Sequence, residues 1–272
     1  NQIEVSCSCI LSHPDAPMKT CIAVLTRGYP HLDQYQKLIR RNQSIAAHLQ
    51  DRTVPLLFFH EGNILPDHQA YIARQTPELT LRFVDVVRDG RAFRQEKAAI
   101  PHEPSTVRWG NLGYRHMCSF WFVDCWSFLS EYDLMVRIDE DCEMRTSLDD
   151  VLARMRTAPE PQALLTARMM DDQDFVCVGM NAFTRNFVRQ EIHGNDPTPS
   201  IPEKYPSSGP YTNFIVMRLD RLRDQDALMY YIQAVDQSNK IYRERWGDLS
   251  LWGEAVTYLL GDDALFVDTT VQ

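Results

Sequence analysis

The sequence predicts an α/β protein with a mixed, mostly parallel central sheet flanked by helices. Three observations predict this class. Short apolar runs alternate with helical periods through residues 20–86, as they do where crossover helices join parallel strands. A further short apolar run, Leu134–Ile138, has the composition of a buried strand and leads into three consecutive acids. An apolar fraction of 44% over 272 residues suffices for one large domain or two small ones.

The first half of the chain accounts for most of the expected sheet. We expect strands at 21–26, 54–59 and 79–86, and helices at 32–49 and near 67–74. Parallel sheets bind ligands at the carboxyl ends of their strands. We therefore expect the residues at those ends to contact a nucleotide, with ordinary loop chemistry as the alternative. These residues are Thr26, Arg27, Gly28 and Asp85.

The second half alternates less regularly. A charged connection at 87–108 precedes an aromatic-rich, apolar stretch at 114–129, which predicts a buried helix. Gly179 weakens the helical pattern around it. A proline-rich loop is expected at 194–210, and residues 1–19 are expected to be a tail or linker. The other expected elements are strands at 134–138, 163–167, 211–217 and 264–267 and helices at 146–156, 175–192, 224–237 and 249–260.

The acids after the strand at 134–138 are the strongest chemical signal. Alternate residues leave a strand on opposite faces, so Asp139 and Asp141 can point the same way while Glu140 points elsewhere. Two hard oxygen ligands suit Mn²⁺ or Mg²⁺ bound to a diphosphate. This is the D-x-D arrangement of glycosyltransferases that use nucleotide sugars. A solvated acidic turn is the alternative.

Charge and composition exclude some function classes. A net charge of -9 argues against nucleic-acid binding, and no apolar run is long enough to span a membrane. The chain begins at Asn1, so a signal or anchor could have been removed. Of the seven cysteines, we expect Cys21 and Cys177 to be core thiols, whereas Cys7 and Cys9 could form disulfides in an oxidising compartment.

Three stretches, taken in order, resemble one family. Residues 114–118 (YRHMC) are similar to a family motif Y-R-x-M-C, and residues 132–141 are similar to Y-x-x-x-W-R-V-E-P-D. Residues 242–248 (YRERWGD) are similar to Y-E-R-W-G-D. The family is the fungal α-1,2-mannosyltransferases of the Kre/Mnt type. The resemblance implies a single domain of the GT-A fold at 20–272, with a nucleotide-binding half at about 20–145 and an acceptor-binding half at about 146–272.

The resemblance also implies a reaction and a location. The family uses GDP-mannose with Mn²⁺, so we expect transfer of a sugar from a nucleoside diphosphate sugar to a hydroxyl of a glycan or glycoconjugate. A secretory, Golgi-like lumen is implied, and a cytoplasmic location is the alternative. Two functional positions differ from the family pattern: Ile215 replaces a glutamate proposed to be catalytic, and Trp252 replaces a histidine that completes the metal site.

Several residues are candidates for roles in that reaction. Asp139 and Asp141 are expected to hold the metal, with a third ligand from Asp248, Glu254 or His193. Tyr114 and Arg115 are expected to contact the diphosphate, or else to pack at a helix start. Asp248 is also a possible helix N-cap, and His116 is expected to be a packed helix residue. Asn213 could assist at the anomeric carbon, and the candidates for a base are Asp171, Asp172, Asp248 and Glu254.

Two alternative functions are compatible with this sequence. A phosphatase of the haloacid dehalogenase type also places D-x-D after a buried strand. That class continues D-x-D-x-T and carries its acids near the first strand, whereas here Cys142 and Glu143 follow, halfway along the chain. A non-catalytic relative that binds a sugar or nucleotide is the second alternative, and the residues at 215 and 252 favour it.

Overall fold

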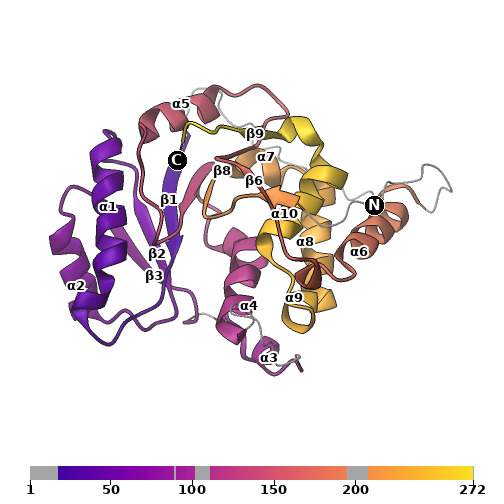
Figure 1. The fold of residues 1–272 in the computed structure, drawn as a ribbon, viewed down its shortest axis with the longest axis horizontal. Coiled ribbons are helices and arrows are strands. Elements are labelled where there is room, and N and C mark those ends of the chain that lie inside the picture. Colours follow the sequence, from indigo (N-terminus) through magenta and orange to yellow (C-terminus); the bar gives the residue numbers. More distant parts are fainter. Residues whose placement is uncertain (1–17, 89, 102–110, 195–207, 272) are drawn as a thin grey trace, which may run out of the picture.

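A seven-stranded sheet runs through the protein in the order β3-β2-β1-β4-β8-β5-β9 (Figure 1). The computed structural model describes residues 18–88, 90–101, 111–194 and 208–271. Strands β1 to β4 are parallel, β8 runs antiparallel to β4 and β5, and β9 is parallel to β5. The predicted mixed, mostly parallel sheet is therefore confirmed. Its strands are β1 (Thr20–Leu25), β2 (Leu56–His60), β3 (Leu81–Asp85), β4 (Leu134–Ile138), β5 (Leu164–Thr166), β8 (Phe214–Arg218) and β9 (Leu265–Val267).

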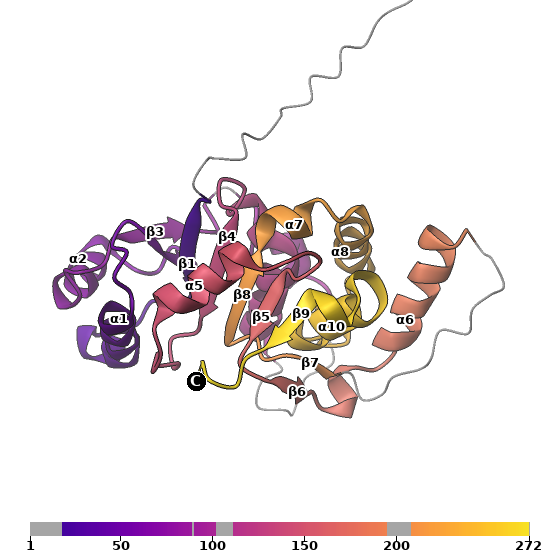
Figure 2. The same cartoon turned by 90° about the horizontal axis from the view of Figure 1, so that it is seen from above.

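Helices cover both faces of this sheet because alternate strand residues point to opposite sides. Ile22 and Val24 of β1 belong to a core that includes residues of α1, α2 and α5, whereas Cys21 and Ala23 belong to the core on the other face. Figure 2 shows α1 and α5 on the same side of the sheet. The helices are α1 (Gln36–His48), α2 (Pro66–Gln75), α3 (Gln95–Ala98), α4 (Leu112–Ser119), α5 (Leu148–Thr157), α6 (Met180–Phe187), α7 (Leu219–Arg223), α8 (Asp226–Ser238), α9 (Lys240–Arg243) and α10 (Asp248–Ala255).

The second half contains more short elements than the sequence predicts. The expected helix at 175–192 is interrupted by Gly179, whose φ of 71° lies in the left-handed region, and α6 begins only after it. Two three-residue strands, β6 (Met169–Asp171) and β7 (Ser208–Pro210), form a small antiparallel sheet that was not expected. Strand β8 begins at Phe214 rather than at residue 211. The part of the expected loop at 195–207 lies outside the described residues.

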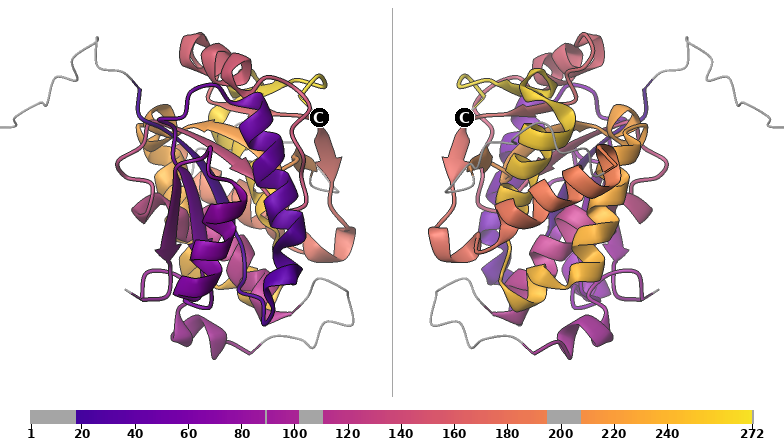
Figure 3. Two further views of the ribbon diagram at one scale, coloured as in Figure 1. Left: turned by 90° about the vertical axis from the view of Figure 1, so that its left-hand side faces the viewer. Right: turned by 90° about the vertical axis from the view of Figure 1, so that its right-hand side faces the viewer.

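Helix α10 packs directly onto β7 through two glycines. A Cβ on Gly253 would lie 1.9 Å from the Ser208 carbonyl oxygen, and one on Gly209 would lie 1.9 Å from the Leu249 carbonyl oxygen. No side chain fits between these backbones. The first turn of α10 is consequently held against the small β6–β7 sheet, at the end of the molecule where α6, α8 and α10 gather (Figure 3).

The two cysteines that were expected in the core lie there. Cys21 and Cys177 are buried, and each of the described cysteines is a free thiol. Cys7 and Cys9 lie outside the described residues, so the proposed disulfides stay a prediction. Among the described helices, none has the length and apolar character needed to cross a bilayer.

Candidate functional site at the carboxyl edge of the sheet

Two of the three motif stretches pack against each other at the site. The Arg115 guanidinium on α4 donates a hydrogen bond to the Tyr242 carbonyl on α9. His116 Nδ1 lies 2.9 Å from the Tyr242 hydroxyl, and its ring stacks on Phe93 with centroids 4.9 Å apart. Both Arg115 and His116 are buried. The contacts of Arg115 match the packing alternative for this residue, and those of His116 match its expected role as a packed helix residue.

The buried His116 makes the stability of the fold dependent on pH. Burial lowers the pKa of its imidazole to about 4, from about 6.5 in an unfolded chain. The unfolded state therefore binds this proton at higher pH, so stability is fully present above pH 6.5 and is lost as the pH falls through the folded pKa. We expect wild type to lose about 2–3 kcal/mol more than His116→Gln between pH 7.5 and 4.5, measured by urea unfolding. His193→Gln, at an exposed histidine, should follow wild type. An identical pH dependence of wild type and His116→Gln would contradict this.

Arg137 lies on β4, just before the acidic motif at residues 139–141, and joins two site carboxylates. Its Nε donates to Asp139 Oδ1 at 2.9 Å, and a terminal nitrogen donates to Asp139 Oδ2 at 3.2 Å. The other terminal nitrogen donates to Asp248 Oδ2 at 2.5 Å. Its guanidinium also lies over the Trp121 ring, 4.4 Å from the centroid. Burial by itself would lower the pKa of Arg137, but Asp139 and Asp248 outweigh burial and raise it.

Sequence reasoning missed Arg137, although a signal for it exists. Arg137 is 3% exposed and is the only charged residue within the apolar strand β4. It precedes Asp139 by two positions, so both side chains leave the chain on the same face. A buried arginine is costly unless its charge is paired or hydrogen-bonded. An arginine inside a predicted buried strand, two residues before an acid, is therefore evidence for an ion pair.

The three acids after β4 have different surroundings. Asp139 faces Arg137 and its side chain is 24% exposed. Glu140 points to the loop after β1, where its carboxylate accepts hydrogen bonds from the Thr26 hydroxyl and the Tyr29 hydroxyl, each at 2.7 Å. Asp141 is exposed. The expected difference in direction between Asp139 and Glu140 is thus present.

The loop after β1 meets the loop after β2. The Gly28 amide donates to Asn63 Oδ1 at 2.8 Å, and a Cβ at Gly28 would lie 2.0 Å from the Asn63 carbonyl oxygen. Only glycine permits this approach. Thr26 is buried against Glu140, whereas Arg27 is exposed with its guanidinium 5.1 Å from the Tyr29 ring centroid. Three expected nucleotide contacts therefore lie at one strand end, beside the acidic motif.

Asp85 lies farther along the same edge, in a separate hollow. Its Oδ1 accepts from the amides of Val87 and Arg88, which shapes the turn after β3. The hollow has a volume of about 610 Å³ and runs between the ends of β2 and β3 and the start of α2. His60 and Arg88 also line it. Asp85 is therefore placed where a ligand at the sheet edge could reach it.

A polar cluster connects Tyr114 on α4 with Arg245 and Asp172. The Tyr114 ring is covered by the Arg245 guanidinium at 4.5 Å, and Arg245 lies 3.9 Å from Asp172 Oδ2. Asp172 also accepts a hydrogen bond from the Ser250 hydroxyl at 3.0 Å. A Cβ at Gly247 would lie 2.9 Å from the Asp172 carboxylate, so glycine leaves room for this acid. Through these contacts Tyr114 of the first motif stretch (114–118) meets Arg245 of the third motif stretch (242–248).

Asp248 and Asn213 also lie beside Asp139. Asp248 is 3% exposed and is the first residue of α10. Gly247 is the N-cap, so the expectation that Asp248 caps the helix is wrong; its carboxylate turns instead to Arg137. The Asn213 carbonyl accepts from the Asp139 amide at 2.9 Å, because β8 runs antiparallel to β4.

The remaining candidates lie in other surroundings. Glu254 is buried, and its carboxylate accepts hydrogen bonds from the Asn181 side chain on α6 at 3.2 and 3.3 Å. His193 is exposed. It directly follows the helical turn Val188–Ile192, which continues α6. Asp171 is exposed at the end of β6. For these three, a catalytic or metal-binding role stays a prediction from sequence.

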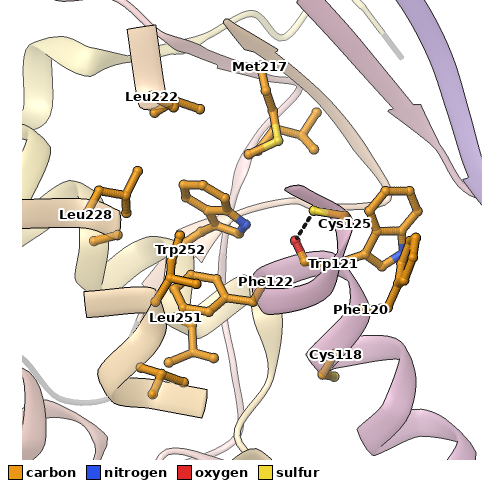
Figure 4. Packing of buried hydrophobic residues seen from close by; sticks show 14 of the residues in the cluster. Cys118, Phe120, Trp121, Phe122, Cys125, Met217, Leu222, Leu228, Leu251 and Trp252 are labelled. Carbon is orange, nitrogen blue, oxygen red and sulfur yellow. Dashed lines mark hydrogen bonds between the residues drawn. The ribbon is translucent and has the colours of Figure 1, made fainter. Parts of the chain in front are cut away.

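The two positions that depart from the family pattern are part of the core. Trp252 is 2% exposed and packs on Phe122 and Trp126, with ring centroids 5.4 and 6.3 Å away. Figure 4 shows Trp252 among apolar side chains that include Phe122 and Leu251. Ile215 is buried in β8 opposite Arg137. Neither side chain can ligate a metal.

The acids at this edge fit a metal that is shared with a ligand. Among the described residues, no three His, Cys, Asp or Glu side chains gather into a metal cage. Mg²⁺ and similar ions, however, are commonly held by one or two carboxylates with substrate phosphates and water. Asp139 and Asp141 would supply these carboxylates, since each oxygen of Asp139 has one lone pair beyond its bond from Arg137. The donor set therefore suits a cation held together with a diphosphate.

Comparison with solved structures identifies the fold. Core-mannan synthase A (CmsA/Ktr4) from Aspergillus fumigatus, in an Mn/GDP form, matches with a TM-score of 0.73 and 14% identity over 94% of this chain and 74% of that one. The mannosyltransferase Ktr4p from S. cerevisiae matches with a TM-score of 0.68 and 17% identity, over 89% of this chain and 66% of that one. This chain has the GT-A glycosyltransferase fold.

A neighbour from another branch shares that architecture. Mouse xyloside xylosyltransferase 1, in its apo form, matches with a TM-score of 0.56 and 15% identity, over 92% of this chain and 85% of that one. No protein-family model and no curated protein sequence matches the chain. At these identities the likeness concerns the fold, so membership of the Kre/Mnt-type family stays a resemblance.

Proposed function

We propose that this protein is a glycosyltransferase that moves a sugar from a nucleoside diphosphate sugar to a hydroxyl of a glycan or glycoconjugate. The observation that carries the proposal is the contact of Arg137 with both Asp139 and Asp248 at the carboxyl edge of a GT-A sheet. All three motif stretches contribute to this place, since Met117 of the first also lies 3.9 Å from Arg137. GDP-mannose is the first donor to test, because two mannosyltransferases of this fold were solved with GDP.

In this proposal each residue has a separate task. Asp139 and Asp141 would hold a divalent cation, Mn²⁺ or Mg²⁺, together with the diphosphate of the donor. Such a cation acts as a Lewis acid that stabilises the departing diphosphate. Arg137 fixes the orientation of Asp139, and Thr26, Arg27 and Gly28 form the neighbouring wall on the nucleotide side. The bond from the anomeric carbon to the diphosphate oxygen breaks, the acceptor oxygen bonds to that carbon, and the proton of the acceptor hydroxyl passes to the departing diphosphate.

A panel of nucleotide sugars tests this function. GDP-mannose, UDP-xylose and UDP-galactose are each incubated with Mn²⁺ and simple sugar acceptors, and release of GDP or UDP is measured. We expect one donor to be turned over and to bind in calorimetry, and binding to weaken in Asp141→Asn. Absence of binding of every nucleotide sugar by wild type would contradict the proposal.

A non-catalytic protein that binds a sugar or nucleotide is the second candidate. The burial of Ile215 and Trp252 favours it, because the resemblance places functional residues at these two positions. The same panel separates the two candidates. Tight nucleotide binding without release of nucleoside diphosphate, over the whole set of donors and acceptors, would support the second.

A further inference from the structure

Arg41 on α1 is a buried cation without a hydrogen-bond acceptor. Its side chain is 0% exposed, and none of its three guanidinium nitrogens has a hydrogen-bond partner among the residues that the structure describes. Its guanidinium carbon lies 5.5 Å from the centroid of the Phe58 ring. Burial lowers the pKa of Arg41 only to about 10, so the group is charged at neutral pH.

Helix α1, which carries this cation, contacts the turn that contains the acidic motif. The carboxylates of Glu140 and Asp139 favour its charged form and partly offset the effect of burial on its pKa. The same helix is tied to the end of the acidic turn, since the Ser44 hydroxyl accepts a hydrogen bond from the Met144 amide at 3.0 Å. Arg41 is therefore buried on the helix that contacts this turn, and the carboxylates of the turn act on its charge.

An unpaired buried charge is costly in the state that contains it. Burial without hydrogen bonds removes the hydration of the guanidinium and returns only the weak attraction of an aromatic face. Native proteins rarely leave such a group unsatisfied. A second state that brings an anion to Arg41 would therefore be favoured.

Glu140 is the side chain that can change partners. Its carboxylate is now held by the hydroxyls of Thr26 and Tyr29. Those hydroxyls belong to the loop after β1, where the proposed nucleotide would bind. In this state an acid thus occupies two donors that a phosphate or ribose would use, and its charge would repel a diphosphate.

We propose that Arg41 is a positioning residue that pairs with the Glu140 carboxylate when a nucleoside diphosphate binds, releasing Thr26 and Tyr29 to the ligand. The proposal rests on the proposed function. The free protein then holds Glu140 on the β1 loop and leaves Arg41 unpaired, whereas the liganded protein satisfies both. Binding is coupled to this exchange, because a ligand favours the state for which it has the higher affinity.

The free protein provides the first test. Arg41→Met replaces an unpaired cation by an apolar side chain of similar length next to Phe58, so thermal unfolding without nucleotide should occur at or above the wild-type temperature. Arg40→Met is the matched control, since Arg40 is the exposed neighbour on the same helix and the charge change is identical. A clear fall in the unfolding temperature of Arg41→Met alone would show a partner in the free protein and overturn the proposal.

Nucleotide binding provides the second test. Calorimetry uses GDP and UDP with Mn²⁺ on wild type, both arginine variants, Glu140→Gln and the Arg41→Met/Glu140→Gln double variant. We expect Arg41→Met to weaken binding about tenfold in the wild-type background and by less than about twofold when residue 140 is glutamine. Arg40→Met should bind as wild type does.

The outcomes separate this proposal from the proposed function. An equal loss in both backgrounds would mean that Arg41 acts on the nucleotide by its charge and not through Glu140, which would overturn the proposal and leave the proposed function intact. Unchanged binding in Arg41→Met would do the same. If wild type binds neither nucleotide, the proposed function fails, and the proposed exchange fails with it.

Discussion

Arg137→Met is expected to lower the free energy of unfolding by about 3–5 kcal/mol, measured by urea denaturation. The substitution leaves two carboxylates, Asp139 and Asp248, without the cation that holds them. Asp248 is fully within the protein, so water cannot replace the guanidinium there. Removal of one partner of a buried ion network costs far more than the network contributes, because the remaining charges are uncompensated.

Two further variants define the cause of this effect. Arg154→Met removes the ion pair with Asp268, but Arg154 is half exposed and the loss should be at most about 1 kcal/mol. A triple variant, Arg137→Met with Asp139→Asn and Asp248→Asn, should recover a large part of the stability because it removes the stranded charges. If Arg137→Met unfolds no more easily than Arg154→Met, Arg137 does not hold a buried network.

Asp141→Asn is expected to abolish the dependence of nucleotide binding on Mn²⁺ while leaving the fold intact. Asp141 is exposed, so its replacement should change stability by less than about 0.5 kcal/mol. Wild type lacks a protein-only metal cage among its described residues. Mn²⁺ should therefore bind weakly without nucleotide, and its affinity should rise about tenfold or more when GDP is present. By reciprocity, Mn²⁺ should raise the affinity for GDP by the same factor.

Electron paramagnetic resonance of Mn²⁺, with and without GDP, measures this coupling without any turnover. Glu143→Gln is the matched control, because it removes a neighbouring exposed acid that the metal site does not use. Equal Mn²⁺ binding with and without nucleotide would contradict a shared site. A dependence of GDP binding on Mn²⁺ that is as strong in Asp141→Asn as in wild type would also contradict it.

The fold was predictable because most of its elements carry a clear hydrophobic period. Strand β4 lies at the expected residues, 134–138, and Ser147 caps α5 by accepting from the Asp150 amide. The strands β6 and β7 have three residues each, too few for an alternating pattern. They form because α10 packs on β7 through glycine contacts, and such contacts join segments far apart in the chain.

The candidate site was predictable in location but not in its pairing. The acids after β4 stand at the carboxyl edge as expected, and Thr26 lies beside them. The sequence pattern shows which residues can ionise, but it does not show which of them meet. Trp252 illustrates the limit, since a motif position associated with a metal ligand lies in the core against Phe122.

The sequence by itself determined the α/β class, the strand that carries the acids and the edge where a ligand would bind, because these follow from local hydrophobic periodicity and strand polarity. Only the tertiary structure decided that Arg137 joins Asp139 to Asp248, that Glu140 is held by the β1 loop, and that Arg41 is buried with no hydrogen-bond partner among the described residues. The physical reason is distance along the chain: Arg137 and Asp248 are 111 residues apart, and their contact arises only when the sheet and α10 pack together.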